Sequence, residues 1–177
     1  RRAMALRGRV PAALAGGVTT LQVLPGSANL VGGRGVTLRN VPATSYQAMK
    51  FPGAPWGLKM ACGENPKRVY GGKGTTPSTR MGNVAGYRAA FIDASEYLRK
   101  NGGGKPQEKP KRRWWQSADG DGKGDSAGDA GGKRDLKLDT LAGAINGDIL
   151  VHIHCSRADE MATMIDLAKQ VDFRIAA

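Results

Sequence analysis

The chain has 177 residues, enough for one ordinary domain with a hydrophobic core, and it carries a formal net charge of +12. No apolar run approaches the length of a membrane span, and the basic, alanine-rich start lacks the continuous apolar core of a signal peptide. These features argue against a membrane protein. They favour a cytoplasmic over an exported one, with the mature N-terminus expected outside this chain.

The charge and the cysteines each leave two interpretations open. A basic chain can bind nucleic acid or an anionic membrane, but charges spread along the sequence favour an ordinary solvated surface. Cys62 and Cys155 are too far apart to specify a disulfide framework. We expect two small buried thiols in a reducing compartment, with a single bridge between them as the alternative.

The first part of the chain predicts short elements separated by glycine-rich loops. Residues 3–15 predict a helix, and the two glycines that follow are typical of a helix end. β-branched and apolar residues predict a buried strand over 18–24. A glycine-rich loop with a short strand at 36–38 comes next, and an apolar strand over 56–63 ends in a turn at 64–66.

A long helix and a polar insertion are predicted in the middle of the chain. Residues 79–100 place apolar side chains near helical spacing, and Thr79 is a suitable N-cap. Residues 101–134 are rich in glycine and charged residues and nearly lack aliphatic ones, so they cannot offset the entropy of ordering. We expect a flexible, basic, glycine-rich insertion that separates the first part of the fold, 1–100, from its continuation, 135–177.

The end of the chain alternates between helices and strands. The order helix, strand, helix and the beginning of a strand is predicted over 136–147, 148–155, 156–171 and 173–177. Ser156 and Asp159 predict a capping box at the second helix. Near-continuous apolar strands that alternate with amphipathic helices predict an α/β fold with parallel strands, doubly wound or a barrel. Active residues of both architectures lie at the carboxyl ends of the strands.

His152 and His154 are the only two histidines in the chain. Because strand side chains alternate, both point to one face of the predicted strand, near its carboxyl end. Imidazole suits zinc, iron or nickel, so the pair can be part of a metal site. The alternative is a pair of ordinary strand histidines. The spacing does not decide between the two, since a zinc site needs three or four ligands.

Lys59 lies inside the apolar strand predicted over 56–63. Burial disfavours the ammonium form, and a neutral amine can act as a base, form a Schiff base or become a metal-bridging carbamate. The alternative is a lysine at a strand edge with its charged end in solvent.

Three further motifs carry less weight. The stretches "VGGRGVT" and "YGGKGTT" do not match a phosphate-loop pattern. The stretch "DGDGKGD" is similar to a calcium loop but has Lys123 at a ligand position, which favours a solvated linker. The basic stretch "KPKRRWWQ" could stack on single-stranded nucleic acid, although docking of its tryptophans on the protein body is the favoured interpretation.

Long blocks of the sequence carry a family resemblance. The most specific are "GENPKRVYG" at 63–71 and "HCSRADEMATMID" at 154–166, and related blocks cover nearly the whole chain except 101–134. They resemble the metal-dependent amidohydrolase superfamily, in particular its imidazolonepropionase- and prolidase-like branch. The resemblance implies a TIM-type (β/α) barrel with one or two divalent metals. We expect zinc first, with iron, nickel or manganese as alternatives.

The resemblance also assigns residues. The block "VHIHCSRADEM" resembles the fifth barrel strand, which implies His154 as a metal ligand, with His152 as its neighbour. Lys59 resembles the middle-strand lysine that is often carboxylated in this family. The family's first-strand histidine pair, sixth-strand histidine and eighth-strand aspartate have no counterpart here. We therefore expect an internal fragment with a partial barrel.

The implied activity is hydrolysis of a C–N bond in a small-molecule amide, cyclic amide or dipeptide by a metal-activated water. We expect the isolated chain to be inactive, because the remainder of the barrel must supply other ligands. The alternative is a non-enzymatic basic protein that binds nucleic acid through 105–116, which we expect less. The sequence does not determine the substrate or the oligomeric state.

Overall fold

The computed structural model describes residues 9–101 and 134–176. Most of the predicted insertion at 101–134, including the basic segment at 105–116, lies outside the described residues. The helices and strands follow one another along the chain as α2 (Arg9–Ala15), β1 (Thr20–Val23), β2 (Val31–Arg39), α3 (Tyr46–Met49), β3 (Trp56–Ala61), α4 (Glu64–Gly71), α5 (Arg80–Lys100), α6 (Leu136–Ile145), β4 (Ile149–His154) and α7 (Ala158–Val171).

The fold is mixed α/β, with an open four-stranded sheet in the order β1-β2-β3-β4. β1 and β3 both run antiparallel to β2, and only β3 and β4 form a parallel pair of strands. The expectation of parallel strands throughout is therefore wrong for the first two strands. The connection between β1 and β2 is too short for the crossover that a parallel pair requires, so the chain turns back as a hairpin.

Parallel pairing continues beyond β4, at the far edge of the sheet. Ile175 forms a parallel bridge with Val151, and the Val151 amide donates to the Arg174 carbonyl over 2.9 Å. The Ala176 amide donates back to the Val151 carbonyl, also over 2.9 Å. The strand predicted to begin at 173–177 is thus present as a short bridge beside β4.

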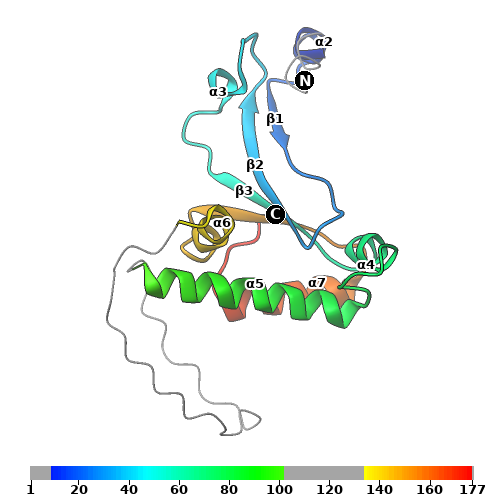
Figure 1. The fold of residues 1–177 in the computed structure, drawn as a ribbon. Helices are drawn as coiled ribbons and strands as arrows, with labels where there is room; N and C mark the ends of the chain where they lie inside the picture. Colours follow the sequence, from blue (N-terminus) through cyan, green and yellow to red (C-terminus); the bar gives the residue numbers. More distant parts are fainter. Residues whose placement is uncertain (1–8, 102–133, 177) are drawn as a thin grey trace, which may run out of the picture.

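Helices α5, α6 and α7 lie on one side of β3 and β4, whereas the β1–β2 hairpin extends away from this layer toward α2 and α3 (Figure 1). The main core fills the space between this part of the sheet and the helices. It includes Leu58 and Met60 of β3, Val151 of β4, and Phe91, whose ring stacks on Phe173 with 4.9 Å between the centroids. Alternation along β3 therefore sends Leu58 and Met60 toward the helices and Lys59 to the opposite face.

The hairpin explains two differences from the predictions. The segment at 18–24 was expected to be buried, but β1 lies mostly in solvent, and Val23 is 45% exposed, because the hairpin projects beyond the helical layer. β2 has nine residues instead of the short strand expected at 36–38. Its glycines belong to the strand: a bulge lies between Val31 and Gly33, and Gly33 has a φ of 117°.

One predicted N-cap agrees with the structure, and two other predictions at helix starts do not. The Thr79 side chain accepts from the Gly82 amide over 3.0 Å, which confirms the predicted N-cap of α5. The turn expected at 64–66 is instead the start of α4. The capping box expected at the start of α7 is also wrong, because Arg157 is the N-cap and makes no side-chain cap.

Candidate functional site

Three polar side chains lie on the face of the sheet that points away from the helices. Lys59 of β3 and His152 of β4 are direct partners in the parallel register, and His154 is the partner of Ala61. Because side chains two residues apart point the same way, Lys59, His152 and His154 share this face. His154 is the last residue of β4, at the carboxyl end of the parallel pair.

Lys59 is buried, with 8% of its surface exposed, and it has one polar partner. Its Nζ donates to Ser27 Oγ over 2.9 Å, and Ser27 lies in the connection between β1 and β2. Burial lowers the pKa of Lys59, because the ammonium loses hydration. The interpretation of Lys59 as a solvent-exposed edge lysine is therefore wrong, and the side chain is held under the hairpin.

His152 is half-buried and is held from β1. Its Nε2 lies 3.0 Å from Gln22 Nε2, so the imidazole accepts a hydrogen bond there in the tautomer that leaves Nε2 unprotonated. Desolvation, followed by the charge of Lys59, lowers the pKa of His152. A Cβ on the neighbouring Gly57 would lie 2.9 Å from His152 Cδ2, so the glycine leaves room for the ring.

His154 differs from His152 in its surroundings. It is exposed, and its imidazole makes no hydrogen bond or ion pair with any other described residue. Its backbone carbonyl accepts from the Cys62 amide over 2.8 Å, which extends the β3–β4 ladder by one residue. The ring thus lies at the carboxyl end of the sheet with its nitrogens available to a ligand.

The two residues predicted as metal ligands, Lys59 and His154, therefore share one face of one strand pair. Within 9–101 and 134–176, no three His, Cys, Asp or Glu side chains gather closely enough to hold a metal ion. An imidazole and a modified lysine are suitable zinc donors, but two donors do not complete a coordination shell. The donor chemistry fits a metal, whereas the number of donors is incomplete in the described part of the chain.

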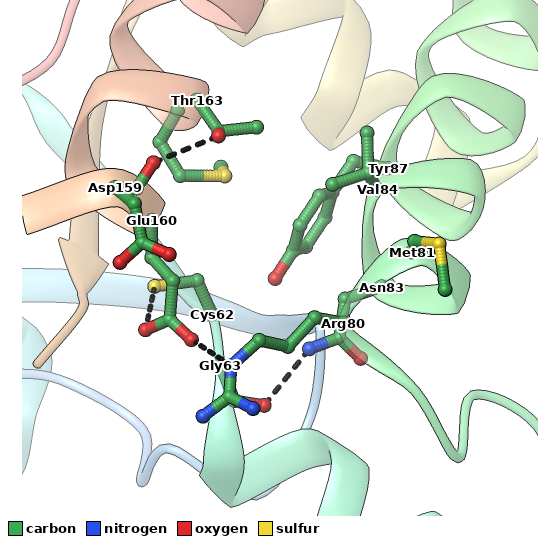
Figure 2. A pocket seen from close by; sticks show the side chains of 11 residues that line it. Cys62, Gly63, Arg80, Met81, Asn83, Val84, Tyr87, Asp159, Glu160 and Thr163 are labelled. Carbon is green, nitrogen blue, oxygen red and sulfur yellow. Dashed lines mark hydrogen bonds and ion pairs between the residues drawn. The ribbon is translucent and has the colours of Figure 1, made fainter. Parts of the chain in front are cut away.

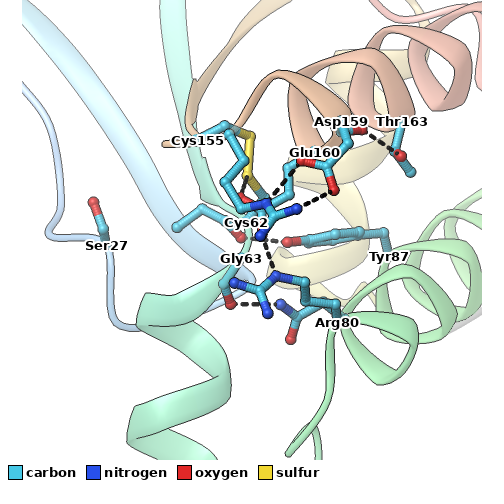
Figure 3. The surroundings of a disulfide bond; sticks show 12 residues. Ser27, Cys62, Gly63, Arg80, Tyr87, Cys155, Asp159, Glu160 and Thr163 are labelled. Atoms are coloured by element: carbon cyan, nitrogen blue, oxygen red, sulfur yellow. Dashed lines mark hydrogen bonds and ion pairs between the residues drawn. A yellow bond between two sulfur atoms is a disulfide. The ribbon is translucent and has the colours of Figure 1, made fainter.

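The opposite face carries a cross-link at the same strand ends. Cys62 directly follows β3 and Cys155 directly follows β4, and the two are joined by a disulfide with 5.2 Å between their Cα atoms (Figure 3). The expectation of two separate thiols is therefore wrong, and the single bridge left open as the alternative is present. The parallel register explains the pairing, since it brings residue 62 beside residue 155 despite a separation of 93 residues.

A cavity of about 210 Å³ lies on this face, between the start of α5 and the start of α7 (Figure 2). Glu160 of α7 is 9% exposed, and its Oε1 accepts from Arg80 Nε of α5 over 2.7 Å. Arg80 also lies 3.5 Å from the carboxylate of Glu64 in α4. One arginine therefore links three helices beside the end of β3.

Two hydrogen bonds fix Gly63 and Ala61 at this end of β3. Asn83 Nδ2 donates to the Gly63 carbonyl over 2.9 Å, and the Tyr87 hydroxyl donates to the Ala61 carbonyl. A Cβ on Gly63, whose φ is 69°, would lie 2.3 Å from Glu160 Oε2. Burial, and secondarily the charge of Glu160, raises the pKa of Tyr87, so the phenol stays protonated and donates.

Glu160 and Arg80 were not among the residues predicted for the site. A signal was present, because Glu160 precedes Met164 by four residues and Leu167 by seven, which are buried positions of α7. A carboxylate at a core-facing position indicates a partner of opposite charge, and that partner is Arg80.

Among the helices of the described part, none combines the length and the hydropathy that a membrane span requires.

Comparisons with known proteins agree on one family. No protein-family model matches the chain. It is 34% identical over 171 residues to amidohydrolase tasK of Hapsidospora irregularis, a match that covers 92% of this chain and 16% of that protein. The crystal structure of an amidohydrolase from Thermotoga maritima MSB8 superposes with a TM-score of 0.72 at 31% identity, covering 94% of this chain and 38% of that one. The chain is thus similar, over nearly all of its length, to a part of two amidohydrolases, which supports an amidohydrolase family for it.

Proposed function

We propose that this chain is part of a metal-dependent amidohydrolase that cleaves an amide or cyclic-amide C–N bond with a metal-activated water. The observation that carries the proposal is the position of Lys59 and His154. They share the face opposite the helices, next to the carboxyl ends of two adjacent parallel strands. This is the end of the strands where α/β enzymes bind their ligands.

The proposed architecture is a partial TIM-type barrel. Its support is the parallel pairing of β3, β4 and the bridge at Ile175, with α5, α6 and α7 on one side of these strands. In a barrel of this kind the helices cover the outer face, and the site lies where inward-pointing side chains reach the carboxyl ends of the strands. The antiparallel β1–β2 hairpin then represents an addition to the barrel, and it contributes Ser27 and Gln22 to the inner face.

Lys59 and His154 are the residues we propose to hold the metal. An ammonium has no free electron pair, so Lys59 would bind a metal through its carbamate, and the lowered pKa of Lys59 favours the amine that forms one. When bound, zinc (or iron, nickel or manganese) lowers the pKa of a coordinated water and polarises a carbonyl. Gln22 keeps the ring of His152 oriented beside this pair.

Most of the proposed enzyme lies beyond this sequence. The chain spans 16% of the length of tasK and 38% of that of the Thermotoga structure. We propose that the remaining metal ligands and the substrate-binding loops come from those other parts of the protein, and that the chain alone is inactive. The imidazolonepropionase- and prolidase-like branch, with small cyclic amides or dipeptides as substrates, is the branch we propose.

The test is hydrolysis by the full-length gene product, assayed on cyclic amides, N-acyl amino acids and dipeptides with added zinc. We expect turnover of at least one class, abolished by Lys59→Ala. The control is Lys67→Ala, which removes a half-buried lysine paired with Glu64 in α4 and leaves the site face intact. Equal activity of both variants would contradict the role of Lys59.

A further inference from the structure

We propose that the Cys62–Cys155 bond is a reversible redox device that an external dithiol opens, and that Glu160 controls how readily it opens. The inference goes beyond the proposed hydrolase function and does not depend on it. It uses the face of the sheet that packs on the helices, whereas Lys59 and His154 lie on the other face. It also gives a role to the "RADEM" stretch, which the hydrolytic site does not use.

The backbone around the two cysteines is held independently of the bond between their sulfur atoms. The Cys62 amide donates to the His154 carbonyl over 2.8 Å, and β3 and β4 are paired over six successive residues before that point. The two Cα atoms are therefore kept 5.2 Å apart by the ladder itself, within the range that a disulfide requires. The bond can break and re-form without a rearrangement of the strands.

The two sulfur atoms differ in accessibility. Cys155 is half-buried, whereas only 5% of Cys62 is exposed. An incoming thiolate therefore attacks Cys155, and Cys62 is the sulfur that leaves. The cavity beside Cys62 provides space for the released side chain to rotate away from Cys155 (Figure 2).

Reduction of the Cys62–Cys155 bond takes two steps of thiol–disulfide exchange. One thiolate of the dithiol attacks Cys155 Sγ, the bond to Cys62 breaks, and its electron pair leaves on Cys62 Sγ, which takes up a proton. The second thiolate of the dithiol then attacks the mixed disulfide and releases the Cys155 thiolate, which takes up another proton. Two electrons and two protons pass from the dithiol to the protein, and the dithiol becomes a disulfide. Oxidation by an external disulfide reverses these steps.

Glu160 acts on the sulfur that leaves. Its Oε2 lies 3.8 Å from Cys62 Sγ, close enough to accept from a Cys62 thiol and to repel a Cys62 thiolate (Figure 3). A sulfur that departs as an anion beside a carboxylate leaves more slowly, so Glu160 slows opening of the bond. Arg80 counteracts this repulsion, because its Nε binds Oε1 of the same carboxylate over 2.7 Å. The ion pair thus sets the rate at which the bond is reduced.

The first test is alkylation of the folded protein with iodoacetamide, followed by intact mass measurement. We expect no alkylated cysteine before reduction, and two after treatment with dithiothreitol without denaturant. Two alkylated cysteines before reduction would show that the bond does not form. A bond that resists dithiothreitol until the protein is unfolded would show a permanent cross-link. Either result overturns the proposal.

The second test compares the rate of this reduction in matched variants. Glu160→Gln should accelerate it by roughly several-fold, because removing the negative charge 3.8 Å from Cys62 Sγ makes this sulfur a better leaving group. Arg80→Gln should slow it, because the carboxylate loses its counter-charge. Asp159→Asn should leave it unchanged, since the Asp159 carboxylate binds Arg157 at the surface. If a substitution only loosened the fold, reduction of the disulfide would become faster in both Glu160→Gln and Arg80→Gln. Faster reduction in both variants, or an unchanged rate in both, would therefore overturn the role of Glu160.

Discussion

Lys59 and His152 lie directly opposite each other in the β3–β4 register, and the charge of the lysine helps to keep the histidine neutral. Each is also bound by the hairpin, Lys59 through Ser27 and His152 through Gln22. The hairpin thus covers the part of this face that carries Lys59 and His152, and His154 stays exposed beside it. This arrangement has consequences for the pH dependence of stability.

The free energy of unfolding should decrease as the pH falls below about 6.5, the ordinary histidine pKa. The pKa of His152 is lowered in the folded protein, so below that value the unfolded chain binds more protons than the folded one. Its contribution is fully present above pH 6.5 and is lost as the pH falls through the lowered value. Urea unfolding at several pH values measures how the free energy of unfolding changes with pH, and His152→Gln should weaken this dependence. A pH dependence that is the same in His152→Gln would assign the effect to another group.

Glu160→Ala should lower the free energy of unfolding by about 1–3 kcal/mol, because Arg80 loses its buried partner. The estimate lies below the range for a fully buried pair, since the Arg80 side chain is 43% exposed. The matched control is Asp159→Ala on the same helix turn, where the ion pair with Arg157 is exposed on both sides. Asp159→Ala should lower the free energy of unfolding by less than about 1 kcal/mol. Equal losses in urea unfolding would contradict the importance of the buried pair.

Gly63→Ala should be more destabilising than Gly53→Ala. Both glycines have positive φ values, 69° and 72°, so both variants carry a backbone cost of at least about 1 kcal/mol. Only at Gly63 does a new Cβ meet another side chain, at 2.3 Å from Glu160 Oε2, whereas nothing lies within 4 Å at Gly53. This close contact should destabilise Gly63→Ala by about a further 1–3 kcal/mol. Indistinguishable midpoints of thermal unfolding would indicate that Glu160 moves aside at little cost.

Reduction of the Cys62–Cys155 bond should lower the free energy of unfolding by about 2–4 kcal/mol, because the bond closes a long loop and restricts the unfolded chain. The separation of 93 residues places this bond among long loops, for which the entropic effect is large. Thermal unfolding with and without dithiothreitol measures it. Cys155→Ser should match the reduced protein and should no longer respond to dithiothreitol. A response that persists in this variant would point to another effect of the reductant.

The sequence predicted best those elements whose signal is local. The spacing of Tyr87 and Phe91 and the cap at Thr79 located α5, and the apolar run with a charged residue at Lys59 located β3. The direction of the first strands was not predictable in the same way. An apolar strand has the same composition in parallel and antiparallel pairs, and the glycines of β2 appeared as a loop although they form part of a bulged strand.

The candidate site was predictable in part. Alternation along β4 predicts that His152 and His154 share a face, and the parallel pairing places Lys59 beside His152. The contacts of Ser27 and Gln22 depend on segments that are distant in the sequence, so no local pattern indicated them. Glu160 had a local signal, its core-facing position in α7, but its partner Arg80 lies in a distant segment. The bond between Cys62 and Cys155 follows from strand register, which a spacing of 93 residues does not reveal.

The most direct test of the proposed function is the metal content of the purified full-length gene product, measured by inductively coupled plasma mass spectrometry. The comparison is between His154→Ala and His152→Ala, two variants on the same strand and the same face. We predict that His154→Ala lowers the metal bound per chain at least about tenfold, since it removes a ligand, and that His152→Ala retains most of it. Metal content unchanged by His154→Ala would contradict the assignment of this residue as a ligand, and with it the site proposed here.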